Sequence, residues 1–276
     1  MKQLINHHVH STGSDGKLSP EEVIKFAISK KLNFICFTDH YPYPPDHLEW
    51  GKDFHSEKYY NQIKELIEKY KDKIEISFGA EFNWVENREK WTDNEIKKRH
   101  YDYVLGSLHD LKFNNKIYEI TSSKEKLAEA IKDFSGIKDF AKEYYRQMGL
   151  LIKSNLFDAI GHFDVIRMWS ETLSKELEKE QWYKEEVIKT LDLAKEKKIV
   201  IEINTGGWRR LCKEQYPSFW ILIEMRKRNI PITIGIDSHY ETEIDNGFHE
   251  AINLAKKAGY KSILKFKNRK PIEIKI

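Results

Sequence analysis

The chain has 276 residues, of which 40% are hydrophobic and 33% charged, and its 47 basic and 44 acidic side chains give a formal net charge of +3. This composition excludes a disordered chain, and the dispersed charge argues against a nucleic-acid surface. No apolar run approaches the ~18 residues of a membrane span and no signal-like segment follows Met1, so we expect a cytoplasmic protein with no membrane partner. The two cysteines, Cys36 and Cys212, form no CxxC pair and are expected to be buried, reduced thiols.

Apolar runs alternate with helical segments in the first third of the chain. A strand is expected over residues 4–10, and Ser19-Pro20-Glu21-Glu22 supplies an N-cap, a first-turn proline and a capping-box glutamate for a helix to about residue 30. The continuous apolar run 34–38 predicts a strand buried on both faces. Prolines make residues 41–45 a loop that could form a lid, and a helix is expected from Ser56 through Tyr70.

The same alternation continues to the C-terminus. Strands are expected at 74–80, 101–106, 157–160, 199–203 and 230–234, with helical segments at 122–155, 172–198 and 247–258 and an irregular stretch after residue 109. Seven strands joined by helices imply a parallel sheet, either open or closed into a barrel. We favour closure, because ligand-type residues follow nearly every strand, as they do where loops converge over one face of a barrel.

Side chains that bind metals recur at the ends of these expected strands. Residues two apart on a strand point to the same face, so His8 and His10 can hold one ion while His7 points the other way. Asp237 and His239 repeat this spacing near the C-terminus. The nine candidate ligands are His8, His10, Asp15, His40, Glu81, His109, His162, Asp237 and His239.

One ion cannot use nine ligands, which implies two or three divalent ions that share a bridging carboxylate and hydroxide. Mixed imidazole and carboxylate ligands suit zinc, manganese or iron without ranking them. Glu81 could instead cap a helix or form a salt bridge, but an unpaired carboxylate at the end of an apolar strand would be costly. Asp15 precedes Gly16, and an Asp-Gly pair by itself is more typical of a turn.

These motifs, in this order, resemble the polymerase and histidinol phosphatase (PHP) superfamily over essentially the whole chain. The motifs are His8-x-His10, Ser14-Asp15-Gly16, Thr38-Asp39-His40, Gly79-x-Glu81, Gly106-Ser107-x-His109, Gly161-His162 and Asp237-x-His239. The resemblance implies a single domain over residues 1–276, folded as a distorted (β/α)7 barrel with a trinuclear metal centre. It assigns His8, His10, Glu81 and Asp237 to the first metal, Asp15, His40 and His239 to the second, and Glu81, His109 and His162 to the third.

Two segments are similar to the histidinol-phosphate phosphatase branch of that superfamily. They are Gly161 to Arg167 and Glu202 to Arg209, and Arg167 and Arg209 could both bind a phosphate, with surface salt bridges as the simpler alternative. The chain departs from the family pattern at Thr205-Gly206-Gly207-Trp208-Arg209, where Thr-Ser-Gly-Leu-Arg is usual, and at Asn83, where an Asp is usual. These departures concern the pocket and leave the candidate ligands intact.

The resemblance implies hydrolysis of L-histidinol phosphate to L-histidinol and phosphate in histidine biosynthesis, with a metal-bridging hydroxide as the nucleophile. Asp164 or a metal-bound water could protonate the leaving alcohol. Tyr41, Tyr43, Trp84 and Trp208 could stack on the imidazole or serve as core and lid residues. The alternatives are a PHP phosphoesterase that acts on nucleotides or nucleic-acid 3′ ends, and a metal-stabilised binding module without activity.

Overall fold

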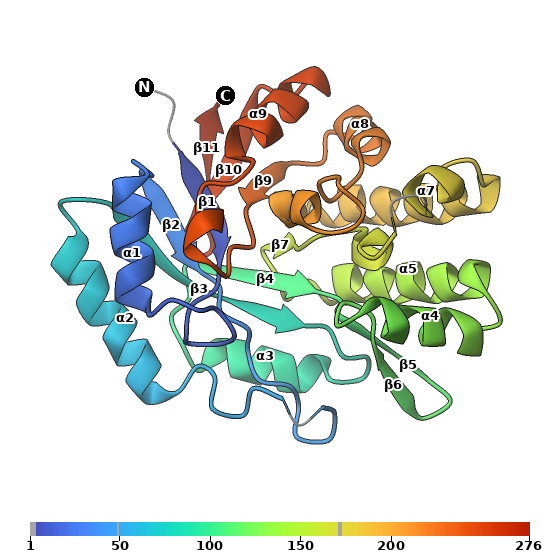
Figure 1. The fold of residues 1–276 in the computed structure, drawn as a ribbon, viewed down its shortest axis with the longest axis horizontal. Helices are drawn as coiled ribbons and strands as arrows, with labels where there is room; N and C mark the ends of the chain where they lie inside the picture. Colours follow the sequence, from blue (N-terminus) through green and yellow to red (C-terminus); the bar gives the residue numbers. More distant parts are fainter. Residues whose placement is uncertain (1–3, 49, 171–172) are drawn as a thin grey trace.

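The computed structural model describes residues 4–48, 50–170 and 173–276. At its centre lies a seven-stranded sheet whose neighbouring strands all run parallel (Figure 1). The strands, in spatial order, are β1 (Ile5–Val9), β2 (Phe34–Phe37), β3 (Glu75–Asn83), β4 (Tyr103–Ser107), β7 (Ala159–Ile160), β8 (Val200–Asn204) and β9 (Ile232–Gly235). Spatial order follows chain order, as expected of successive strand–helix–strand units.

The sheet curls until its first and last strands meet. The backbone N–H of Asp237 donates to the carbonyl of His8 at 2.8 Å, and that of His10 donates to the carbonyl of Ser238 at 3.0 Å. Val9 and Ser238 form a parallel bridge at the same place. The predicted distorted (β/α)7 barrel is therefore confirmed, and the open sheet is excluded.

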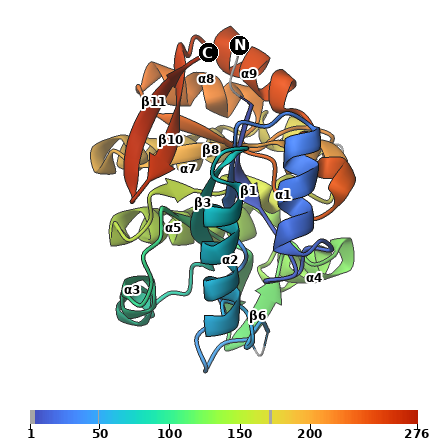
Figure 2. The same ribbon diagram turned by 90° about the vertical axis from the view of Figure 1, so that its left-hand side faces the viewer.

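Helices form the layer outside the barrel (Figures 1 and 2). They are α1 (Pro20–Ser29), α2 (Glu57–Tyr70), α3 (Glu89–Lys97), α4 (Lys124–Asp133), α5 (Ile137–Ser154), α6 (Leu173–Leu177), α7 (Gln181–Lys197), α8 (Phe219–Lys227) and α9 (Phe248–Lys257), with short 3₁₀ helices η1 (Val165–Arg167), η2 (Thr205–Arg209) and η3 (Glu241–Glu243). The expected capping box starts α1. α3 and α8 lie outside the expected helices. Within the described residues, no helix has the length and apolar character needed to cross a membrane.

Two antiparallel hairpins accompany the barrel. β5 (Asp110–Phe113) and β6 (Lys116–Glu119) occupy the stretch expected to be irregular, and they begin directly after His109. β10 (Ser262–Lys267) and β11 (Lys270–Lys275) follow α9, and Phe266 of β10 packs on Tyr103 with 4.9 Å between ring centroids. The first hairpin thus extends the end of the barrel that carries the candidate ligands.

The expectation that His7 points away from His8 is wrong, because β1 has a register shift at this point and its side chains do not alternate strictly. His7 points into the barrel, where it meets Tyr103 of β4 with 5.6 Å between ring centroids. Its ring packs against Phe34 with 4.7 Å between centroids, and burial lowers its pKa to about 3, so it is neutral at pH 7. We expect His7→Leu to keep full metal content and activity and to change the free energy of unfolding by less than about 1.5 kcal/mol, because it replaces one packing group by another. The matched variant His8→Leu should lose metal. Metal analysis and urea unfolding test this, and metal loss from the His7 variant would contradict it.

Candidate metal centre

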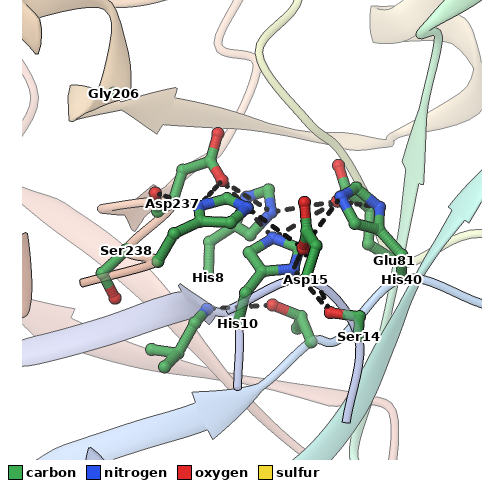
Figure 3. A network of polar contacts seen from close by, with 12 residues as sticks. His8, His10, Ser14, Asp15, His40, Glu81, Gly206, Asp237 and Ser238 are labelled. Atoms are coloured by element: carbon green, nitrogen blue, oxygen red, sulfur yellow. Dashed lines mark hydrogen bonds and ion pairs between the residues drawn. The ribbon is translucent and has the colours of Figure 1, made fainter. Parts of the chain in front are cut away.

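The candidate ligands reach one place because they lie at the carboxyl ends of the strands or just beyond them. Figure 3 shows His8 of β1, His10 just beyond that strand and Glu81 of β3 gathered with His40 and Asp237. His109, His162 and His239 come from the loops that follow β4, β7 and β9. The structure therefore gathers all nine residues that the sequence singled out.

Glu81 is the hub of this arrangement, with 1% of its surface exposed. Its Oε2 lies 3.0 Å from Nδ1 of His40 and 3.3 Å from Nε2 of His8. Its Oε1 lies 3.0 Å from Nε2 of His162 and 3.4 Å from Nε2 of His109. One carboxylate thus presents each of its oxygens to a different set of imidazoles, which is the arrangement a bridging ligand needs.

The other two carboxylates complete the opposite side of the site. Oδ1 of Asp237 lies 3.4 Å from Nε2 of His10 and 3.6 Å from Nε2 of His8. Oδ1 of Asp15 lies 3.3 Å from Nε2 of His239. Asp15 therefore belongs to the site as well as to a turn, so its turn role and its candidate ligand role are compatible.

Three overlapping groups of ligand atoms occur in the described part of the chain. Within each group all atoms lie within 4.8 Å of one another, and the groups are His10, Asp15, His40 and His239; His8, His10 and Glu81; and His40, Glu81 and His109. Nε2 of His162 lies 3.1 Å from Nε2 of His109, beside the third group. The groups match the three implied metal positions in outline, and the assignment of each side chain to one ion stays a prediction.

Buried charge explains why this cluster suits cations. Burial alone would lower the pKa of His8, but neighbouring carboxylates, Glu202 foremost, raise it well above its usual value. Burial likewise lowers the pKa of His40, and Glu81 reverses this and brings it to about 9. Protonated imidazoles thus balance the buried carboxylates, and a divalent ion that binds here would displace those protons.

Unpaired polar atoms provide a direct test of whether the site fits metal ions. Nε2 of His8, Nε2 of His10 and Oε2 of Glu81 are buried and make no hydrogen bond, although Oε2 lies 3.3 Å and 3.5 Å from the two ring nitrogens as an ion-pair contact. Leaving such atoms without a partner costs free energy, and coordination of a cation would satisfy all three. Nitrogen and carboxylate donors of this kind fit zinc, manganese or iron.

Glu202 orients the ligands from behind. It is fully buried, its Oε1 bonds Nδ1 of His8 at 2.8 Å, and its Oε2 accepts the backbone N–H of His162 at 3.0 Å. This leaves Nε2 of His8 free to face Glu81. A Cβ at Gly235 would lie 1.8 Å from Oε1 of Glu202, so only glycine leaves room for it. The sequence interpretation did not assign Glu202 this role, although a charged residue inside an apolar strand was a usable signal.

Asp39 plays a similar part for the loop that carries Asp15. Its Oδ1 accepts the backbone N–H of Ser11 and the hydroxyl of Ser14, both at 2.7 Å, and Tyr59 also donates to its carboxylate. The motif residue before His40 therefore shapes the site without belonging to the candidate ligands.

Backbone strain occurs at two of the candidate ligands. His162 and Asp237 have φ values of 24° and 57°, in the left-handed region that favours glycine. Hydrogen bonds hold both, because the N–H of His162 donates to Glu202 and that of Asp237 to the carbonyl of His8. Strain of this kind is retained where it places a functional side chain.

The centre opens into a cavity of about 300 Å³. Beside seven of the candidate ligands, it is lined by Tyr43, Trp50, Glu119, Thr121, Ser122, Val165, Met168 and Arg210. Of the aromatic residues proposed from the sequence, Tyr43 reaches this cavity, whereas Trp84 is a core residue with 2% exposure. The sequence interpretation missed Arg210, which lies in a loop where no periodicity indicates how a side chain points, and Glu119, which ends a strand in the stretch expected to be irregular.

The structure does not bring the two arginines chosen from the sequence into this lining. Arg167 is 1% exposed, and its guanidinium bonds Asp164 and Glu214, each at 2.6 Å. Arg209 donates from Nη2 to the carbonyl of Asp237 at 2.8 Å. Asp164 is fully buried and its Oδ2 accepts a hydrogen bond from Arg167, so the geometry does not support it as the proton donor. The catalytic roles of Arg167, Arg209 and Asp164 stay predictions.

The family model of the PHP domain matches residues 6–206, which is more than half of the chain. The chain belongs to the PHP family. The resemblance noted in the motifs is thereby confirmed, and this match covers six of the seven PHP motifs, all except Asp237-x-His239.

PHP relatives of known name extend over nearly the full chain. A probable histidinol-phosphatase of Deinococcus radiodurans is 26% identical over 95% of this chain and 93% of its own, and a histidinol-phosphatase of Lactococcus lactis is 29% identical over 99% and 100%. A putative histidinol phosphatase of Listeria monocytogenes superposes with a TM-score of 0.81 at 20% identity, covering 89% of this chain and 99% of that one. The L. lactis histidinol phosphate phosphatase, complexed with zinc, L-histidinol and phosphate, gives 0.79 at 23% identity over 99% and 100%. Both structures share the PHP fold described above.

Proposed function

We propose that this chain is a metal-dependent phosphomonoester hydrolase that converts L-histidinol phosphate and water to L-histidinol and phosphate, in histidine biosynthesis. The observation that carries the proposal is the buried carboxylate of Glu81, surrounded by imidazoles and opening into a cavity of about 300 Å³. Relatives named histidinol-phosphatases, aligned over 95% and 99% of the chain, support the choice of substrate.

Two to three divalent ions, zinc, manganese or iron, fit the donor atoms of this site. His8, His10, Glu81 and Asp237 would hold the first, Asp15, His40 and His239 the second, and Glu81, His109 and His162 the third. Bound divalent cations supply Lewis acidity toward the phosphate and a water that ionises near neutral pH. The chain itself fixes the ligands, through Glu202 behind His8 and Asp39 behind the loop of Asp15.

The remaining cavity residues suit a small substrate that carries a negatively charged phosphate and a positively charged ammonium group. Among the described residues, Arg210 is the one Arg or Lys in the lining, and Glu119 is the one carboxylate there outside the candidate ligands. Arg210 would neutralise the phosphate, Glu119 would accept the ammonium group, and Tyr43 and Trp50 would pack on the imidazole. A nucleic-acid strand needs several cations along its path, and this cavity offers one.

Phosphate release tests the proposal. Protein of known metal content, supplemented with manganese, zinc or iron, is assayed on L-histidinol phosphate, an aryl phosphate, a nucleoside monophosphate and a single-stranded oligonucleotide. A kcat/KM for L-histidinol phosphate well above the others supports the proposal. Preference for the nucleotide or oligonucleotide would make the chain a different PHP phosphoesterase, and bound metal without turnover of any ester would make it a binding module.

Arg210→Gln is expected to lower kcat/KM for L-histidinol phosphate by about 10- to 100-fold, the loss of one charge-assisted hydrogen bond to the phosphate. Metal content should not change, because Arg210 is an exposed residue outside the candidate ligands. Lys213→Gln is the matched control, since it removes a nearby exposed cation that does not line the cavity. Equal kinetics for the two variants would remove Arg210 from the phosphate site.

A further inference from the structure

Asp110 is a buried carboxylate directly behind the candidate ligand His109, at the start of β5. It is 4% exposed. Its Oδ1 lies 2.8 Å from Nε2 of His47, and its Oδ2 accepts from Nδ2 of Asn83 at 2.8 Å. Burial raises the pKa of Tyr43, and the neighbouring carboxylate of Asp110 raises it further, which keeps that hydroxyl protonated as a donor. Asp110 thus gathers donors from the end of β3 and from the loop after His40.

Asn83 links Asp110 to the metal centre, because it is hydrogen-bonded to both Asp110 and His109. Its Oδ1 lies 2.9 Å from the backbone N–H of His109 and 3.2 Å from Nδ1 of the same residue. A carboxylate can only accept, so the amide of Asn83 must turn its NH₂ to Asp110 and its oxygen to His109. That orientation puts the proton of His109 on Nδ1 and leaves Nε2 free, and Nε2 is the atom that lies 3.4 Å from Glu81.

The loop at the other end of this chain of hydrogen bonds forms part of the cavity wall. His47 stacks on Tyr43 with 5.2 Å between centroids, and Tyr43 contacts Trp50 at 6.0 Å. Trp50 in turn packs edge-on against His40 at 5.2 Å. Tyr43 and Trp50 both line the cavity. The loop is therefore connected to the metal centre in two ways. Trp50 packs directly on His40, and His47 is linked to His109 through the hydrogen bonds of Asp110 and Asn83.

We propose that Asp110 is a positioning residue, which acts through Asn83 to couple the cavity wall to the third metal position. Order in the loop that carries Tyr43 and His47 fixes the carboxylate of Asp110, the carboxylate fixes the amide of Asn83, and the amide fixes the ring of His109. A metal held by His109 then stabilises the loop in return. The inference rests on the metal centre of the proposed function but not on the identity of the substrate.

Exchanging the two side chains tests the coupling. Asn83→Asp alone places two carboxylates against each other, and Asp110→Asn alone leaves one of two donors without an acceptor. In the double variant Asn83→Asp/Asp110→Asn, the new carboxylate accepts from His109 and from the new amide, whose oxygen still accepts from His47. Asn83 also donates to the carbonyl of Trp84 at 3.0 Å. That bond is lost in Asn83→Asp and in the double variant alike, so the difference between these two reports the contact between positions 83 and 110.

Each single variant is expected to bind its weakest metal ion about 10- to 100-fold less tightly, the usual effect of losing an outer hydrogen bond to a ligand. In the metal-free state, proteolysis of the loop should become faster. In the metal-loaded enzyme, KM should rise more than kcat falls. The double variant should return within about 3-fold of the parent on all readouts. Asp53→Asn, which removes an exposed charge from the same loop, should change nothing.

The inference would be overturned if each single variant had the metal affinity and the rate of loop proteolysis of the parent. It would also be overturned if the double variant were as impaired as the two single variants combined. Metal affinity and proteolysis need no substrate. A protein that fails to hydrolyse L-histidinol phosphate would therefore contradict the proposed function while leaving this coupling open to the same measurements.

Discussion

Glu81→Gln is expected to remove bound metal and to lower kcat by at least about 1,000-fold, or about 4 kcal/mol of transition-state stabilisation. The reason is the position of Glu81 at the hub, where Oε2 faces His8 and His40 while Oε1 faces His109 and His162. The amide has one ligating oxygen in place of two and carries no charge. It also points an NH₂ group at imidazole nitrogens that must stay free for a cation.

Metal analysis and phosphate release measure the effect, with Glu75→Gln as the matched control. Glu75 lies on the same strand but is exposed at its start, where it pairs with Lys265 on the surface. We expect the control to match the parent in metal content and in kcat. A Glu81 variant that retains all its metal and works within about 3-fold of the parent would show that Glu81 is not a bridging ligand.

The sequence predicted the metal cluster well because strand geometry is periodic. A spacing of two residues lets His8 and His10 reach the same carboxylate, and the structure shows this. The expected opposite orientation of His7 is not observed, because a register shift in β1 turns His7 into the barrel as well. Parallel strands also end at one edge, so Glu81 and His162 could be expected to meet although 81 residues separate them. Both arguments use only backbone geometry, which the apolar runs reveal.

Loop side chains follow no such period, so the sequence predicted less well which of them line the cavity. Two adjacent arginines end the segment after β8, and the sequence favoured Arg209, whereas Arg210 is the one that lines the cavity. η2 turns Arg209 toward the carbonyl of Asp237. Asp110 was missed for a similar reason, because its hairpin was expected to be irregular and its partners lie 27 and 63 residues away.

Arg167→Met is expected to destabilise the protein by about 3–5 kcal/mol, because it leaves the buried carboxylate of Asp164 without its cation. Arg167 is 1% exposed and Asp164 is fully buried, with 2.6 Å between Nε and Oδ2. Burial raises the pKa of Asp164, and the guanidinium of Arg167 opposes this without reversing it. Urea unfolding of the metal-free protein measures the loss without any contribution from metal or substrate.

The double variant Asp164→Asn/Arg167→Met separates a structural role of Arg167 from a catalytic one. If Arg167 serves the ion pair, removing both charges recovers most of the lost stability, and kcat/KM recovers with it. If Arg167 also reaches the phosphate, stability recovers while kcat/KM stays about 10- to 100-fold low. The sequence favoured the second role and the observed contacts favour the first, because Asp164 and Glu214 already hold the guanidinium away from the cavity lining. A single variant as stable as the parent would contradict the ion pair itself.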